Sequence, residues 1–121
     1  METEGLLITN NTVERVVVDG YESIKTLVGG WIDAVRTSDG EMVGYVHDEG
    51  LITGLPMNPI ATALFGTIIA GPCVLVHASN AQGESDGADY PLTESDLRRV
   101  AWLAGAYRMW IDAHLARAEF A

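Results

Sequence analysis

Residues 58–77 read NPIATALFGTIIAGPCVLVH and decide the fold, because they join a capped helix to a core strand. The side chain of Asn58 can cap a helix, and Pro59 suits the first helical position, where no N–H is needed. Gly66 ends this helix after about two turns. The apolar run 73–77 then predicts a strand inside the core. A short helix followed by a buried strand indicates a domain that mixes α and β structure.

Two β-hairpins are predicted on the N-terminal side of this stretch. Asn10-Asn11 forms the first turn, since adjacent asparagines tolerate the positive φ of a two-residue turn. Asp39-Gly40 is the signal for the second turn. The flanking strands are 6–9 with 13–18, and 31–35 with 42–46.

Two further helices complete the expected architecture. Residues 21–28 have apolar positions at helical spacing, and Gly29-Gly30 ends them. Thr93 can cap a long helix from Glu94 to about Glu119, which an acidic and mobile loop precedes. We therefore expect one α+β domain with a mostly antiparallel sheet of about five strands, two short helices and a long C-terminal helix. Its parts are an αβ core (1–77), the acidic loop (78–92) and the long helix (93–119).

The long helix carries two apolar stripes, whereas a surface helix of a monomer needs one. Either the helix lies deep in the domain or its second stripe packs on another chain, and self-association is the favoured alternative. Trp102, Met109 and Trp110 are the predicted interface residues on the second stripe. The first stripe consists of Leu97, Val100, Ala104, Tyr107, Ile111 and Leu115, and the second of Trp102, Leu103, Ala106, Met109, Trp110 and Ala113.

The bulk composition excludes several classes of protein. Seventeen acidic residues against seven basic ones give a formal charge of −10, which repels nucleic-acid phosphates. The acidity is either a solubility coat or a surface for a basic partner. Cys73 is the single cysteine, so no disulfide forms within the chain and a buried thiol is expected. A signal peptide and a membrane-spanning run are both lacking, which predicts the cytoplasm.

The titratable residues do not assemble into a predicted active site. His47-Asp48-Glu49 is a dense cluster, but consecutive side chains at a turn diverge. His77 and Ser79 fall on one face of a continuing strand, yet the sequence locates neither an orienting acid nor an oxyanion hole for them. The scattered histidines match no zinc motif. We therefore expect no catalytic residues, no metal site and no cofactor.

Three blocks of the chain resemble a family of small proteins of unknown function, found mainly in phages of actinobacteria and in mobile elements. The blocks are GGWI (29–32), GYVHDEG (44–50) and GLPMNPIATALFG (54–66). The resemblance implies a phage accessory protein acting in the host cytoplasm, and it supplies no catalytic residues. Fold maintenance explains most of these blocks. A ligand site around Asn58 and Thr62 is the remaining interpretation.

Two functions are therefore expected from the sequence. The first is a non-enzymatic protein that binds or modulates a host protein, with a homodimer through the long helix as a further possibility. The alternative is a small-molecule binder, such as a sponge for a nucleotide signal, with Asn58 and Thr62 in its pocket.

Overall fold

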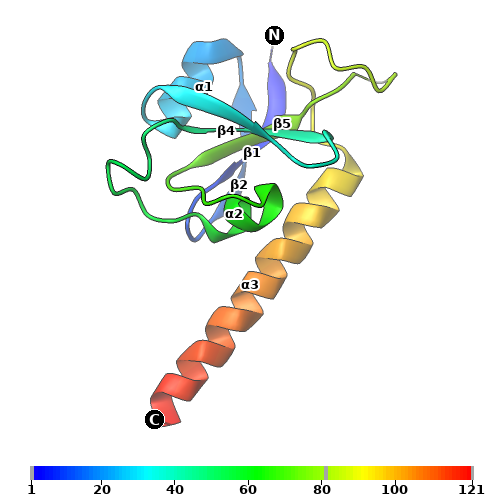
Figure 1. Cartoon of the computed structure of the whole chain (residues 1–121). Helices are drawn as coiled ribbons and strands as arrows, with labels where there is room; N and C mark the ends of the chain where they lie inside the picture. Colours follow the sequence, from blue (N-terminus) through cyan, green and yellow to red (C-terminus); the bar gives the residue numbers. More distant parts are fainter. Residues whose placement is uncertain (1, 81, 121) are drawn as a thin grey trace.

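A computed structural model gives the fold of residues 2–80 and 82–120, with side chains described as far as Arg108. These residues form one five-stranded sheet of order β2-β1-β5-β4-β3, in which all neighbours are antiparallel (Figure 1). The strands are β1 (Thr3–Ile8), β2 (Val13–Val18), β3 (Ile32–Arg36), β4 (Met42–His47) and β5 (Cys73–His77), and the helices are α1 (Gly20–Val28), α2 (Pro59–Phe65) and α3 (Glu94–Phe120). The predicted α+β class is confirmed.

Strand β5 lies at the centre of the sheet and is buried along its whole length. Its side chains alternate between two apolar clusters. Val74 and Val76 pack with α1, whereas Cys73 and Leu75 pack with α2 and α3. A strand that is covered on both faces reads as a continuous apolar run, which is the pattern seen in the sequence. By the same alternation, His77 lies on the face of Cys73 and Leu75.

The first hairpin has a different turn from the predicted one. Ile8 pairs with Val13, so four residues and not two connect β1 to β2. Among the described residues, no residue other than glycine has a positive φ, and the asparagines therefore do not adopt the left-handed conformation. Instead the N–H of Thr9 donates to the carbonyl of Thr12 at 2.9 Å, and their hydroxyls lie 2.6 Å apart. Side-chain hydrogen bonds of the two threonines replace the backbone geometry that adjacent asparagines suggest.

Gly44 in β4 gives the ring of Phe65 a place to pack against the sheet. A Cβ atom at this position would lie 2.6 Å from Cζ of Phe65 and 2.9 Å from Sγ of Cys73. We expect Gly44→Ala to lower the free energy of unfolding by about 1–3 kcal/mol, because the core has no room for the methyl group. Denaturant unfolding measures this change. Gly105→Ala is the matched control. Apart from the adjoining backbone of α3, no atom of the described side chains or of the sheet lies within 4 Å of the added Cβ, and helix propensity predicts a gain of about 1 kcal/mol.

The thiol of Cys73 is completely buried, as the sequence predicts. Burial raises the pKa of this thiol to about 12. Because thiol reagents attack the thiolate, we expect labelling of the native protein to be on the order of 100-fold slower than labelling in denaturant. Equal rates of reaction with an aromatic disulfide reagent in the two conditions would contradict the buried position.

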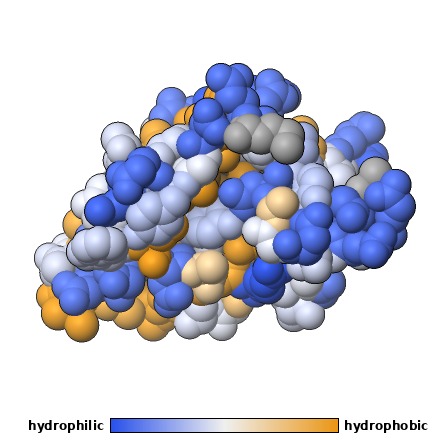
Figure 2. Space-filling view, turned by 90° about the horizontal axis from the view of Figure 1, so that it is seen from above, coloured by the Kyte–Doolittle hydropathy of each residue, from blue (hydrophilic) through white to orange (hydrophobic). Residues whose placement is uncertain are grey.

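Helix α3 packs against α2 near its start and then continues away from the sheet (Figure 1). Its 27 residues span about 40 Å at the usual helical rise. The opposite end of the molecule, which carries the N-terminus and the loop after β5, has a mostly hydrophilic surface (Figure 2). Within the described part of the chain, no helix combines the length and the apolar character needed to cross a membrane.

Candidate functional site

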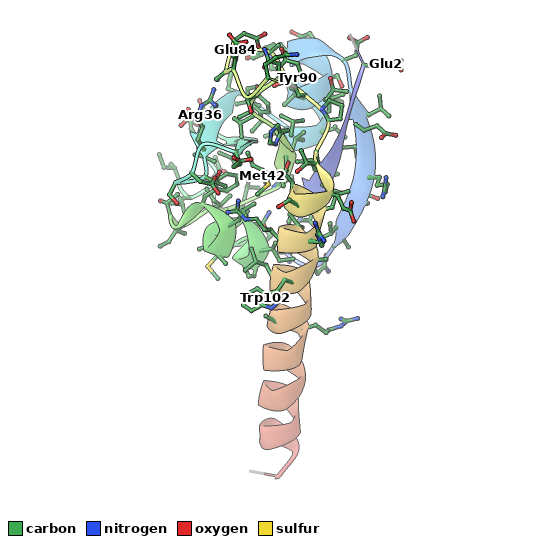
Figure 3. All side chains as sticks on the ribbon, turned by 90° about the vertical axis from the view of Figure 1, so that its right-hand side faces the viewer. Glu2, Arg36, Met42, Glu84, Tyr90 and Trp102 are labelled. Carbon is green, nitrogen blue, oxygen red and sulfur yellow. The ribbon has the colours of Figure 1, made fainter. Side chains whose placement is uncertain are left out.

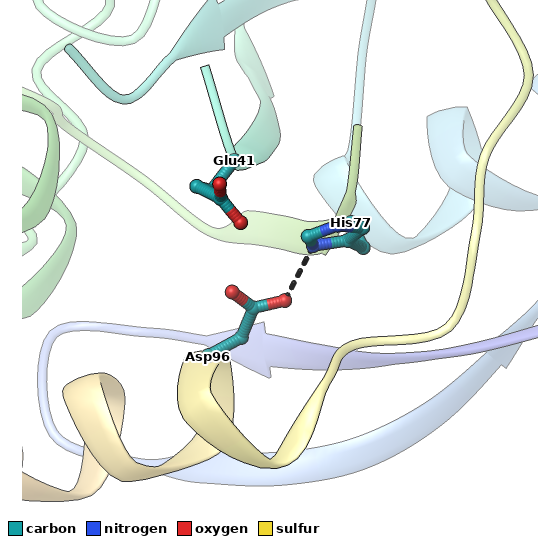
Figure 4. A group of neighbouring side chains, drawn as sticks. All are labelled: Glu41, His77 and Asp96. Atoms are coloured by element: carbon teal, nitrogen blue, oxygen red, sulfur yellow. Dashed lines mark hydrogen bonds and ion pairs between the residues drawn. The ribbon is translucent and has the colours of Figure 1, made fainter. Parts of the chain in front are cut away.

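A buried histidine–aspartate pair joins the end of β5 to the first turn of α3. Nδ1 of His77 lies 2.6 Å from Oδ2 of Asp96 (Figure 4), and the two side chains are 10% and 2% exposed. The alternation of β5 directs His77 toward α3, since the residue shares the face of Leu75. The pair therefore fixes where α3 leaves the sheet.

The start of α3 holds Asp96 in place through a capping box. The N–H of Asp96 donates to Oγ1 of Thr93 at 3.1 Å, and the N–H of Thr93 donates back to Oδ2 of Asp96 at 3.0 Å. An aspartate here takes the part that glutamate or glutamine usually plays. The same carboxylate oxygen faces both the backbone of Thr93 and the ring of His77. The orientation of this carboxylate is thus set by local sequence.

Glu41 brings a second carboxylate to the same edge of the His77 ring (Figure 4). Its backbone carbonyl accepts from the N–H of Ala78 at 2.9 Å, which places Glu41 beside the end of β5. One ligand atom from each of Glu41, His77 and Asp96 lies within 4.8 Å of the others. Asp96 and His77 are buried, whereas Glu41 is exposed. The three side chains form a polar cluster that opens to solvent on the side of Glu41.

Ser79 contacts the other nitrogen of the ring, with Oγ 3.3 Å from Nε2 of His77. The sequence predicts that these two residues share a face, and the structure brings them together. Asp96 now supplies the orienting acid of a serine–histidine–aspartate arrangement. The neighbouring N–H groups of Asn80 and Gly83, however, donate to carbonyls within their own loop at 2.9 Å. An oxyanion hole needs such donors to face the substrate, and these two N–H groups do not supply one.

Sequence reasoning missed Asp96 and Glu41 as partners of His77. They lie 19 and 36 residues from it along the chain, and no short spacing motif links them. The available signal was Thr93-x-x-Asp96, which identifies Asp96 as a residue of the first helical turn. The pairing of β4 with β5 that brings Glu41 close is a tertiary contact between distant segments.

Asn58 and Thr62, the predicted ligand-binding residues, both make hydrogen bonds within the fold. Asn58 is entirely buried: its Oδ1 accepts from Ala61 N–H at 3.2 Å, and its Nδ2 donates to the carbonyls of Ile8 and Gly71 at 2.8 and 3.1 Å. The Thr62 hydroxyl accepts from the N–H of Ile69 at 3.0 Å. These side chains join α2 to β1 and to the segment before β5. These hydrogen bonds give both residues a structural role, and the predicted ligand-binding role stays a prediction.

The His47-Asp48-Glu49 turn borders a cleft of about 290 Å³ between the end of β4 and residues 67–70. Asp48 and Glu49 are exposed, as expected for a solvated turn. Nδ1 of His47 accepts from the N–H of Glu49 at 3.0 Å. The imidazole therefore stabilises its own turn.

The surface of α3 provides the second candidate site. Trp102 is 72% exposed and lines a hollow of about 300 Å³ with Ala63, Leu64, Arg99 and Leu103. Figure 3 shows Trp102 on the part of α3 beyond the sheet. On the first predicted stripe Val100 is buried, and Leu97 and Ala104 pack against the core. On the second stripe Trp102 is exposed, whereas Leu103 packs against the core, so only part of this stripe faces outward. Met109 and Trp110 lie outside the residues whose side chains the structure describes.

A second hollow lies at another part of the α3 surface. Its volume is about 350 Å³. Ile60 of α2 and the turn between β1 and β2 border it together with Ala104 and Tyr107 of α3. Helix α3 therefore lies beside two hollows with largely apolar linings.

The comparisons with known proteins identify a family and nothing finer. No curated protein and no solved structure matches the chain. One family model matches residues 3–95, which extend from β1 to the first turn of α3 and leave Trp102 outside. The match agrees with the resemblance to a family of unknown function. The chain belongs to the family described as Domain of unknown function (DUF3846).

Proposed function

We propose that this protein is a phage-encoded, non-enzymatic factor that binds a basic host protein through the face of α3 around Trp102. The observation that carries the proposal is the exposure of Trp102 beside Leu64 and Leu103. The phage origin and the action in the host cytoplasm rest on the three sequence blocks.

The face around Trp102 has the properties of a protein contact. Single exposed apolar residues are ordinary, but here a tryptophan borders a hollow with two leucines. Tryptophan is enriched among the residues that contribute most to binding free energy, and these residues pack into pockets of the partner or beside their own. Arg99 at the rim is paired with Asp39 at 2.7 Å, so its charge is compensated within the chain. An apolar side chain of a partner fits the hollow.

The charge distribution favours a basic partner over a second copy. Residues 98–121 contain four arginines and two acidic residues, so residues 1–97 carry fifteen acidic residues against three basic ones. Two copies joined along α3 would bring two strongly acidic bodies together. A basic protein is attracted by the acidic residues 1–97 and not by α3 itself, so the charge steers the encounter and the apolar face around Trp102 supplies the contact. A host protein that binds DNA has the required charge.

The test combines affinity capture with a salt series. The tagged protein is mixed with lysate of an actinobacterial host at about 50 and about 300 mM salt, and the higher concentration shortens the screening length from roughly 14 to roughly 6 Å. We expect one stoichiometric basic protein whose capture weakens at the higher salt. Capture that does not respond to salt would contradict a basic partner.

Sedimentation of the purified protein in the same two buffers tests the alternative that a second copy of the chain covers the face around Trp102. The proposal predicts a monomer in both buffers. A dimer that tightens as salt rises would identify a second copy as the partner of α3 and overturn the host-protein proposal.

A further inference from the structure

We propose that Glu41, His77 and Asp96 form a binding site for one divalent transition-metal ion, with zinc as the best fit. Glu41 directly precedes β4, His77 ends β5 and Asp96 lies in the first turn of α3. One ligand atom from each residue lies within 4.8 Å of the others. Both carboxylates converge on the same edge of the His77 ring (Figure 4). This site is separate from the proposed protein contact, because it lies at the first turn of α3 and Trp102 lies farther along the helix.

The donor set selects the class of metal. Calcium and magnesium prefer oxygen ligands alone, whereas an imidazole nitrogen with carboxylates suits zinc and its neighbours. Metal–ligand bonds of about 2.0–2.2 Å in a tetrahedral site place ligand atoms roughly 3.4 Å apart. Nδ1 of His77 and Oδ2 of Asp96 are 2.6 Å apart, so the ion requires them to separate by about 0.8 Å. A side-chain rotation is sufficient for a movement of this size.

The surroundings of the ligands are those of metal sites. A histidine bound to a metal through one nitrogen usually donates its other N–H to a fixed acceptor. Oγ of Ser79 lies 3.3 Å from Nε2 of His77 and is such an acceptor. The N–H of Thr93 holds the Asp96 carboxylate at 3.0 Å. Two of the three ligands are therefore oriented by partners outside the ion's own coordination shell.

Charge and exposure also favour a cation. Two carboxylates that approach one histidine repel each other, and a divalent ion compensates both. Arg99 of the same helix is paired with Asp39 at 2.7 Å, so its charge compensates Asp39 and not the two carboxylates of the site. Three protein ligands leave a fourth position, which water can occupy from the exposed side of Glu41. The bound ion would join the start of α3 to the edge of β4 and β5.

Zinc titration of the full chain, without a polyhistidine tag and after treatment with a chelator, tests the site. We expect one zinc ion per chain by calorimetry, a higher midpoint of thermal unfolding with zinc, and the visible absorption of four-coordinate Co²⁺ when cobalt replaces zinc. Glu41→Gln should weaken zinc binding by about tenfold or more. The unfolding midpoint of this variant without metal should stay unchanged, because Glu41 is exposed.

Glu49→Gln is the matched control. Glu49 is an exposed acid next to a histidine, His47, and it lies outside the proposed site. It should leave zinc affinity unchanged. Nitrogen NMR of the imidazoles adds an independent readout: zinc should move the proton of His77 to Nε2. The proposal is overturned if no stoichiometric zinc binds, if zinc binding survives Glu41→Gln in full, or if zinc perturbs His47 and leaves His77 unchanged.

Discussion

Replacing Trp102 by alanine is expected to weaken the affinity for the protein partner by about 30- to 700-fold. This range corresponds to the 2–4 kcal/mol that a central tryptophan contributes to many interfaces. The side chain is 72% exposed and borders the hollow with Leu64 and Leu103, so its removal takes away the largest apolar group of that face. Calorimetric titration of the captured partner measures the change.

Trp31→Ala is the control for this prediction. Trp31 is also exposed, at 64%, and the Nζ atom of Lys25 lies 3.9 Å from the centroid of its ring. Its ring is thus beside α1, and α1 packs on the face of the sheet opposite to α3. We expect Trp31→Ala to change affinity by less than about threefold, as for a residue outside the contact. An equal loss in both variants would indicate a general effect on the protein, and no loss in Trp102→Ala would exclude this face.

Asn58→Ala is expected to cause the largest loss of stability, on the order of 3–6 kcal/mol. The substitution leaves the N–H of Ala61 and the carbonyls of Ile8 and Gly71 without their partner in a fully buried position. Each buried group that loses its hydrogen bond costs about 1–3 kcal/mol, and the helix also loses its cap. For a domain of this size, the midpoint of thermal unfolding should fall by roughly 10 °C or more.

Thr62→Val provides a graded comparison with Asn58→Ala. The Thr62 hydroxyl contacts one residue, Ile69, and is only half-buried, so we expect a loss of about 1 kcal/mol. Denaturant unfolding of the two variants gives both values. If Asn58→Ala costs less than about 1 kcal/mol, the amide does not stabilise the fold. A ligand-binding role for Asn58 would then deserve a direct test.

Local patterns in the sequence predicted the elements of this fold well. The Asp39-Gly40 turn is confirmed, with Gly40 at a φ of +73° and its N–H bonded to the carbonyl of Thr37. The cap of α2 by Asn58 is confirmed as well. Both depend on residues within a few positions of each other, where spacing determines geometry. The left-handed turn at Asn10-Asn11 was wrong because the two flanking threonines satisfy the loop in another way.

The order of the strands was not available from local patterns. Strand β5 is hydrogen-bonded to both β1 and β4, and these pairings join segments about 30 to 70 residues apart. Besides capping α2, Asn58 donates hydrogen bonds to the carbonyls of Ile8 and Gly71, and these bonds depend on the same long-range pairing. The cluster of His77 with Asp96 and Glu41 was missed for this reason too. The exposure of Trp102, in contrast, agrees with helical spacing, which puts it on a different stripe from the buried Val100. Its role in an interface stays a prediction.

Amide hydrogen exchange with and without the partner tests the central claim most directly, because it locates the contact along the whole chain. We predict slower exchange at residues 97–106 of α3 and at the end of α2, next to the Trp102 hollow. The edge strands β2 and β3 and the helix α1 should exchange at unchanged rates. Protection confined to an edge strand or to α1, with α3 unchanged, would contradict the claim that this protein binds its partner through the face around Trp102.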